Sequence, residues 1–466
     1  MDWLSRSNQF ETGDKTDIGF HPEQPCRIRI IEIQEDNDGN VDINPSTIES
    51  QDGYVAWAQQ IGPSLRMEHR PTFCLVMHQR LRGPHDTLKA TALPYDDQTF
   101  TKVCTELCQH RSLAGVIARD STAVLNIRHV NWDFGASSCP SVVYHCKSDT
   151  ESLPRDEDIV LSATCFTNKP VILAVAYGCT DDVLEDIEAW LERIKTSVFH
   201  RLVLPMLFAE LERKRLLDAM EYKSTDLDQK ILDLKNQLKN ERTVSRSLLA
   251  RNNEKRTEIK LTERDAEAVE LWRSISQLKN GIQTLLALLE SMNSHLKDSS
   301  KMRSNNDPHG AEVYPHEKES EMHIESRLDE MIAEINSKLR HCQGLLDGMA
   351  LAMQMERDYY TRQDSRASYS LARASSRDGS TMKIISRLGM YFLPPTFLAG
   401  LFSMSFFNWI PSNSQIIVSP WIALYAGLAA LFTIFTWVYS KRMDIVAEIE
   451  NEKTLRDVDS DGGEIV

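Results

Sequence analysis

The chain has 466 residues, more than one ordinary domain requires, and 41% of them are aliphatic, aromatic or sulfur-containing. Its net charge of −15 argues against nucleic-acid binding, because such proteins normally present a basic face. An acidic balance suits a protein that attracts cations, although most acidic proteins owe it to solubility alone. Residues 1–20 contain neither an apolar core nor a basic run, which predicts no secretory or mitochondrial leader.

Residues 1–180 alternate short apolar runs with polar breaks, which predicts an N-terminal cytosolic α/β domain of unreadable strand order. Helices are expected near 49–60 and 98–109. The runs rich in Val, Ile, Cys and aromatic residues predict strands at 27–33, 72–78, 123–129, 141–146, 159–166 and 170–177. The nine cysteines are scattered and form no CxxC pair, which favours reduced thiols over a disulfide framework.

Cys104, Cys108 and His110 raise the question of zinc. No fourth ligand is evident, and two cysteines four residues apart fit the buried face of a helix better than a metal site. His145-Cys146, within a predicted strand, is expected in the core. No glycine-rich phosphate loop or nucleophile motif is convincing, so the sequence predicts no enzyme.

From Asp181 the pattern changes to long helices, expected over 181–297 with a bend at Pro205. A polar linker at 298–320 and a stalk helix at 321–382 follow. Apolar residues spaced by three and four predict one coiled-coil seam at Leu271, Ile275, Leu278, Ile282, Leu285, Leu289, Met292 and Leu296. They predict a second at Ile324, Leu328, Met331, Ile335, Leu339, Cys342, Leu346, Met349 and Met353. The spacing alone does not choose between a packed helical hairpin and a stalk that leads into a pore.

Residues 388–440 contain no Asp, Glu, Lys or Arg, and they predict an integral membrane protein. Two segments, 383–407 and 419–440, approach the ~20 residues that a helix needs to cross the hydrocarbon. A short outer loop at 408–418 separates them, and an acidic cytosolic tail at 441–466 follows. Within that tail, Asp457–Gly462 mimics the start of an EF-hand loop but the chain ends before the required Glu, so a disordered tail is expected.

The flanking charges predict the orientation. Lys383 and Arg387 begin the first span, while Lys441 and Arg442 follow the second. Basic residues favour the cytoplasmic side, so both termini are expected in the cytosol, with the plasma membrane as the expected location. Pro394-Pro395 removes two backbone donors inside the first span, so that helix must kink or satisfy the freed carbonyls elsewhere.

Residues 375–409, SSRDGSTMKIISRLGMYFLPPTFLAGLFSMSFFNW, resemble the CorA family of divalent-cation (Mg²⁺) transporters, especially its divergent fungal branch. Met382-Lys383, the Phe-Leu-Pro at 392–394 and the Ser-Met-Ser-Phe-Phe at 403–407 fall in the family's order and spacing. The resemblance also implies the α+β architecture with two C-terminal spans. The family signature at the outer end of the first span is Gly-Met-Asn, whereas this chain has Ser403, Met404 and Ser405.

The resemblance implies a pore face on the first span and a ring of oxygens at the pore mouth, where Ser405 would contact the hydrated ion as its metal-site residue. The residues that the family pattern and helical spacing together place on this face are Met382, Ile385, Gly389, Leu393, Thr396, Gly400 and Ser405. The alternative for the stripe is ordinary helix–helix packing through small residues.

The function expected from these patterns is passive influx of Mg²⁺ or a related divalent cation through a homo-oligomeric channel in a lipid bilayer, with no cofactor and no nucleic acid. Two helices from one chain cannot enclose a water-filled path, so several copies are required, and the resemblance implies a homopentamer. The alternative, from a different class, is a membrane-tethered coiled-coil scaffold or regulator that has lost conduction, which the altered signature allows.

Overall fold

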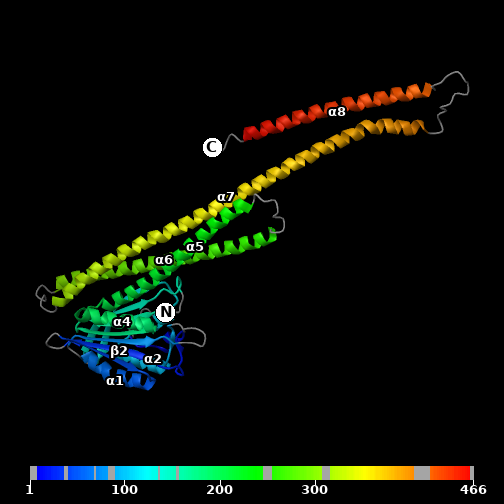
Figure 1. Ribbon diagram of the computed structural model, residues 1–466. Helices are drawn as coiled ribbons and strands as arrows, with labels where there is room; N and C mark the ends of the chain where they lie inside the picture. The colour runs from blue at the N-terminus through cyan, green and yellow to red at the C-terminus, as the bar shows by residue number, and fades with distance from the viewer. Residues whose placement is uncertain are drawn as a thin grey trace. The chain divides into compact units, whose positions relative to one another are not determined.

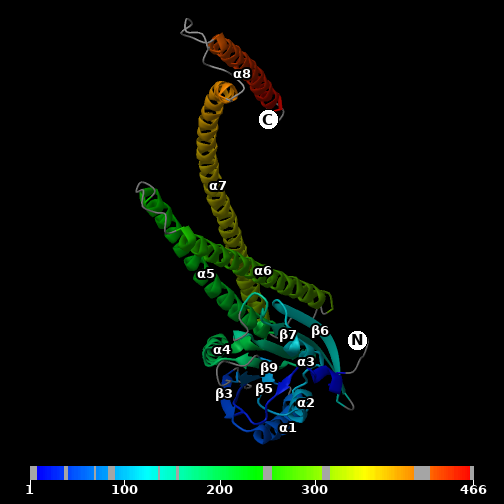
Figure 2. The ribbon, with the colours of Figure 1, turned by 90° about the vertical axis from the view of Figure 1, so that its right-hand side faces the viewer.

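The computed structural model describes residues 8–35, 40–67, 70–81, 90–134, 137–153, 157–244, 254–306, 315–403 and 420–461. The chain divides into two compact units, Met1–Leu351 and Ala352–Val466. The first contains a β-sheet with helices on both faces, and the second consists of long helices (Figures 1 and 2).

The sheet of the first unit has seven strands in the order β3-β2-β4-β9-β8-β7-β6. Only β4 and β9 pair in parallel, and every other neighbouring pair is antiparallel. The strands are β2 (Ile28–Glu35), β3 (Val41–Ile48), β4 (Thr72–Gln79), β6 (Val124–Phe134), β7 (Ser137–Lys147), β8 (Val160–Phe166) and β9 (Val171–Cys179). Two-residue strands β1 (Gly19–Phe20) and β5 (Ala92–Leu93) form a separate parallel pair.

All six predicted strands are confirmed, whereas β3 was not predicted. Its sequence, VDINPSTI, contains a proline and mostly exposed polar residues, because β3 lies at the edge of the sheet. Proline is tolerated there, since an edge strand needs only half of its backbone donors. The short helix α3 (Ser112–Ala118) was missed as well, because seven residues are too few for a clear helical period.

Helices cover both faces of the sheet. Residues of α1 (Gln51–Met67), α2 (Asp97–Glu106) and α3 pack on one face, while α4 (Asp181–Ile194) and α5 (Val203–Val244) pack on the other. Successive residues of β4 belong to the two cores in turn, with Phe73 and Leu75 in one and Cys74 in the other. Such strands are apolar throughout because neither face meets water.

The helical region does not bend at Pro205 but breaks before it. The helix α4 ends at Ile194, a 3₁₀ turn (η3) spans Lys195–Phe199, and α5 begins at Val203. Pro205 therefore lies in the first turn of α5, where its missing N–H costs no helical hydrogen bond.

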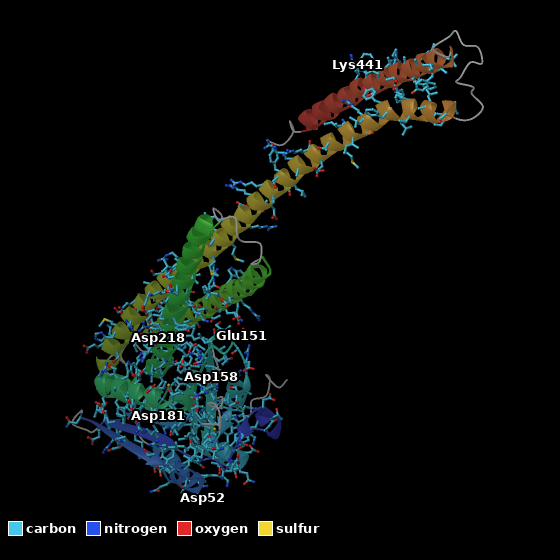
Figure 3. All side chains as sticks on the ribbon, turned by 45° about the vertical axis from the view of Figure 1, so that its right-hand side comes forward. Asp52, Glu151, Asp158, Asp181, Asp218 and Lys441 are labelled. Atoms are coloured by element: carbon cyan, nitrogen blue, oxygen red, sulfur yellow. The ribbon has the colours of Figure 1, made fainter. Side chains whose placement is uncertain are left out.

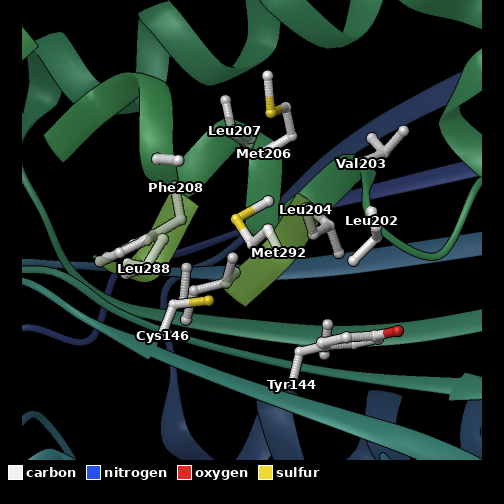
Figure 4. Packing of buried hydrophobic residues seen from close by; sticks show 14 of the residues in the cluster. Tyr144, Cys146, Leu202, Val203, Leu204, Met206, Leu207, Phe208, Leu288 and Met292 are labelled. Carbon is white, nitrogen blue, oxygen red and sulfur yellow. The ribbon is translucent and has the colours of Figure 1, made fainter. Parts of the chain in front are cut away.

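The core on the α4 and α5 face of the sheet extends away from the sheet between three long helices. They are α5, α6 (Glu254–Asn306) and the first part of α7 (Pro315–Phe402). Figure 4 shows Leu288 and Met292 of α6 between the start of α5 and residues Tyr144 and Cys146 of β7. Both predicted seams are buried as far as Met349, apart from the half-buried Leu339. Met353, the last predicted member, is 42% exposed and belongs to the second unit.

Polar contacts fix the antiparallel register of these helices. Asn293 donates to Asp329 at 2.9 Å, and Lys297 pairs with Glu325 at 3.6 Å, which joins α6 to α7. Arg327 pairs with Glu210 at 2.6 Å and joins α7 to α5.

The polar segment predicted as a linker at 298–320 is helical at both ends. The helix α6 continues to Asn306 and α7 begins at Pro315, while residues 307–314 lie outside the described residues.

The second unit contains the rest of α7 and the helix α8 (Pro420–Asp461). The helical segments Asp364–Leu401 and Ile422–Arg442 each contain an 18-residue window apolar enough to cross a membrane, and the mean hydropathies of the two windows are 1.2 and 1.8. The predicted fold class is therefore confirmed: a mixed α/β sheet domain, long helices and two candidate membrane-spanning helices at the C-terminal end.

The disordered tail was a wrong prediction up to Asp461, because α8 runs to that residue. Residues 441–461 contain neither Pro nor Gly, and they extend a helix whose nucleation has already occurred. Residues 462–466 lie outside the described residues.

Candidate functional site

The predicted pore stripe occupies one face of α7. At 3.6 residues per turn, its members from Met382 to Gly400 fall within an arc of about 80°. All of them are exposed in the single chain, with Met382 at 75%, Ile385 at 66% and Leu393 at 70%. Figure 3 shows side chains projecting from the apolar parts of α7 and α8, with Lys441 labelled on α8. This apolar surface requires lipid or further helices to cover it.

Thr396 is the one hydroxyl-bearing member of the stripe that the structure describes. Its Oγ1 donates within its own helix, since the carbonyl oxygen of Phe392 lies 2.7 Å away and that of Leu393 lies 3.0 Å away. The hydroxyl proton is thus used inside α7, and its oxygen lone pairs stay available as acceptors. An acceptor oxygen suits contact with the water around a cation.

Gly389 and Gly400 supply the small positions of the stripe. A Cβ built at either glycine would meet no atom within 4 Å among the parts of the chain that the structure describes. Such positions let two backbones approach closely, or leave room along a path between helices.

Both Pro394 and Pro395 lie inside α7, which continues as a helix to Phe402. The expected disturbance takes the form of curvature in the last part of the helix rather than a break (Figure 1).

Only part of the predicted signature can be located. Ser403 follows the last turn of α7, is exposed, and donates its backbone N–H to the carbonyl of Ala399 at 2.9 Å. Met404 and Ser405 lie outside the described residues, as does the predicted outer loop at 408–418.

Basic residues lie on both sides of the uncharged run 388–440. Lys383 and Arg387 lie on α7, and Lys441 and Arg442 lie on α8. The Lys441 ammonium stands 4.9 Å above the centre of the Trp437 ring, a cation–π contact. An aromatic ring beside a lysine is typical of the boundary between hydrocarbon and headgroups.

Of the residues weighed for zinc, Cys104 and Cys108 belong to the core of the sheet domain, and His110 is half-buried. Burial raises the pKa of the Cys104 thiol to about 12, and its sulfur lies 3.8 Å from the Tyr177 hydroxyl. Burial also lowers the pKa of His110 to about 4, and its ring Nδ1 is hydrogen-bonded to the Ser112 hydroxyl at 2.7 Å. Among the described residues, no three His, Cys, Asp or Glu side chains gather closely enough to hold a metal ion.

A buried polar cluster that the sequence did not single out joins the sheet domain to the long helices. The backbone N–H of Asp149 donates to the Glu212 carboxylate of α5 at 2.9 Å, and Arg215 pairs with Glu212 at 3.0 Å. A Cβ at Gly281 of α6 would lie 2.7 Å from the Asp149 carboxylate, so a larger residue there would force neighbouring atoms to shift. The cluster holds the helices of the first unit against the loop after β7.

Comparison with known proteins covers the helical C-terminal part of the chain. Residues 317–442 match the family model described as CorA-like Mg²⁺ transporter protein. No curated protein matches the chain. The matched region begins two residues after the start of α7 and ends with the second candidate span, so it includes every described member of the stripe. The match is to a family of transporters and not of enzymes, and residues 317–442 are therefore a CorA-like Mg²⁺ transporter family domain.

Proposed function

We propose that the chain is one subunit of a homo-oligomeric channel that passes Mg²⁺ or a related divalent cation passively into the cell. The observation that carries the proposal is the match of residues 317–442 to the CorA-like family, together with two candidate spans inside the matched region. The apolar stripe of α7, exposed in a single chain, supplies a face on which copies can meet around a path.

In the proposed assembly, five copies of α7 surround the pore. Met382, Ile385 and Leu393 form apolar rings that gate by dewetting, while Thr396 contributes acceptor oxygens to the hydrated ion. Ser405 stands at the outer mouth, where the divergent signature replaces an amide oxygen by a hydroxyl. The basic flanks put both termini in the cytosol, and the plasma membrane is the proposed location.

The proposal is tested by Mg²⁺ flux into proteoliposomes at matched protein density. Ser405→Ala should slow entry without loss of folding, and Ser403→Gly with Ser405→Asn should raise uptake or sharpen the preference for Mg²⁺. Equal flux in the wild type and both variants, above that of empty liposomes, would show that position 405 does not control entry of the ion.

A matched pair of substitutions on α7 tests the pore face. Leu393→Ala removes bulk from the stripe and should raise flux, whereas Leu388→Ala removes the same bulk about 100° from the centre of the stripe and should not. Both leucines are exposed in the single chain, at 70% and 59%. An equal change in flux for the two variants would show that this face of α7 does not line the pore.

Assembly and topology provide two further measurements. A mass measurement in mild detergent should give a pentamer, and cysteine labelling should place residues 409–417 outside with both termini inside. An intact oligomer that gives no Mg²⁺ flux, in the wild type or in any variant, would favour the membrane-tethered scaffold. A mass measurement that finds only monomers would rule out the channel.

A further inference from the structure

Residues 362–377 of α7 carry four arginines on one face. Arg362, Arg366, Arg373 and Arg377 fall within an arc of about 60° at 3.6 residues per turn. All four side chains are exposed, and none is paired with another residue that the structure describes. Asp364, within this segment, and Asp378, directly after it, lie on the other side of the helix. This arginine face thus presents a strip of positive charge without a counter-charge of its own.

The C-terminal stretch of α8 has the opposite charge. Residues 444–461 contain seven acidic and two basic side chains, a net charge of −5. Four of the acidic residues, Asp444, Glu448, Glu452 and Asp459, fall within an arc of about 80° on the α8 helix, and Lys453 and Arg456 lie outside it. This acidic face continues the same helix that carries the second candidate span.

The two charged faces have the same spacing when the helices run antiparallel. Backwards along α7, the arginines at 377, 373 and 366 are separated by four and then seven residues. Forwards along α8, the acids at 448, 452 and 459 are separated by four and then seven residues as well. One register therefore aligns Arg377 with Glu448, Arg373 with Glu452 and Arg366 with Asp459.

The ends of the helices support this register independently of the charges. Arg377 lies 25 residues before the end of α7 at Phe402, and Glu448 lies 28 residues after the start of α8 at Pro420. At 1.5 Å per residue these distances differ by only about 4.5 Å. The same register sets Lys383 level with Arg442, so the basic residues before and after the uncharged run 388–440 reach the same height.

We propose that the arginine face of α7 binds the acidic face of α8 in an antiparallel ladder of ion pairs, 377–448, 373–452 and 366–459, on the cytosolic side of the membrane. The ladder rests on the two-span topology proposed above, which brings both helices out on one side. It fixes the cytosolic end of the proposed pore helix to α8 and leaves the predicted pore stripe, on the opposite face of α7, clear of positive charge.

Anionic lipid headgroups are a poorer fit for the arginine face. From Arg377 to Arg362 this face runs about 22 Å along the helix axis. The headgroup region on one side of a bilayer is only about 5–8 Å deep. A helix with the same rise and the same charge spacing matches the whole strip, and the acidic stretch of α8 has both.

Cysteine cross-linking tests the register. The pair Arg373→Cys with Glu452→Cys, oxidised in membranes with copper phenanthroline, should form a disulfide, while the rungs 377–448 and 366–459 remain to hold the helices. The control pair Ala374→Cys with Glu452→Cys differs by one residue and about 100° around α7, and should cross-link far less. On a denaturing gel, a dimer band shows that the ladder joins neighbouring copies. A monomer band whose mobility changes only when reductant is left out shows that the ladder forms within one chain. Equal cross-linking of test and control pairs overturns the ladder.

Charge reversal tests the pairing. Arg373→Glu and Glu452→Arg should each lower the melting temperature of the detergent-solubilised oligomer, the double variant should restore it, and high salt should remove the differences. Arg357→Glu makes the same charge change away from the arginine face and should have no such effect.

Loss of binding to phosphatidylserine vesicles by Arg373→Glu, without rescue by Glu452→Arg, would assign the arginine face to lipid and overturn the ladder. Labelling that places residues 409–417 in the cytosol would overturn the proposed topology itself, whereas missing rescue with that topology intact would overturn the ladder alone.

Discussion

The two parts of α7 use the same side-chain types in opposite ways. Leu328 and Met331, in the first unit, are fully buried, whereas Leu393 and Met382, in the second, are 70% and 75% exposed. In the first part the apolar residues form one seam, and charged residues cover the remaining faces. In the last part, apolar residues occupy every face from Leu388 onwards. A single apolar seam indicates packing against protein, while an all-round apolar surface indicates a bilayer.

The two units also differ in how they satisfy polar groups. The sheet domain buries charged side chains with partners, as with the Lys147 ammonium, which donates to the Ile117 carbonyl at 2.6 Å. In the candidate spans the threonines bond within their own helix, as Thr433 does to the carbonyl of Ala429 at 2.6 Å and Thr436 to that of Phe432 at 3.0 Å. Intrahelical bonding is the solution available where no water and no second polar layer is present.

Breaking a buried ion pair of the sheet domain should have the largest effect. The Arg80 guanidinium and the Asp158 carboxylate pair at 2.8 Å with side chains only 2% and 3% exposed (Asp158 is labelled in Figure 3). Asp158→Ala removes the counter-ion of a buried charge and should cost about 3–5 kcal/mol in the free energy of unfolding, measured by denaturant titration.

The matched control for Asp158 is an exposed pair of the same length. Lys214 and Asp186 also lie 2.8 Å apart, but their side chains are 60% and 48% exposed. Asp186→Ala should therefore cost less than about 1 kcal/mol. Equal losses for the two variants would show that burial does not set the strength of ion pairs in this unit.

The contrast between buried and exposed leucines gives the next effect. Leu285 of α6 is fully buried in the helical core, so Leu285→Ala should destabilise the first unit by about 2–5 kcal/mol. Leu393→Ala, the same truncation in the second unit, should leave the unfolding of the first unit unchanged. The measurement is thermal unfolding in mild detergent, followed by circular dichroism. A comparable loss from Leu393→Ala would contradict the division into separate cores.

Sequence reasoning succeeded where periodicity carries the information. The seams of α6 and α7, the strands with two buried faces and the uncharged run after Leu388 all have patterns that follow directly from burial or from lipid. It failed at β3, where an edge position tolerates Pro45 and polar residues, and at the acidic end of α8, where the incomplete EF-hand-like motif suggested disorder.

The candidate site was predictable only in part. The stripe from Met382 to Gly400 follows from helical phase, and the structure describes it on one exposed face. Its role as a pore remains a prediction, because it depends on how copies assemble. The cluster of Asp149, Glu212 and Arg215 was not predictable, since Asp149 lies 63 residues before Glu212 and no sequence period links the loop after β7 to α5. Gly281, at an otherwise regular helix position, was the one available signal, and its meaning required the neighbouring loop.

The smallest of the predicted effects is a loss of stability in mild acid that is confined to the first unit. Histidine occurs only in that unit, and the last histidine in the sequence is His341. His78 is completely buried, with its Nδ1 3.2 Å from the Ala176 carbonyl, the Tyr95 hydroxyl 3.2 Å from its Nε2, and its ring stacked on Tyr177. The ring therefore stays neutral, donating from Nδ1 and accepting at Nε2. Burial lowers its pKa to about 3, and burial likewise lowers the pKa of His145 to about 3.

An unfolded chain protonates these rings near pH 6.5, whereas the folded chain does not until about pH 3. The unfolded state thus binds more protons between these values, so stability is complete above pH 6.5 and falls as the pH is lowered towards 3. At pH 5.5 each ring should cost about 1.2 kcal/mol relative to neutral pH. His78→Phe should lower stability at every pH but flatten the slope of melting temperature between pH 7 and 5.5 by one ring's share, and His145→Leu should do the same. An unchanged slope in both variants would show that other groups make the fold sensitive to acid.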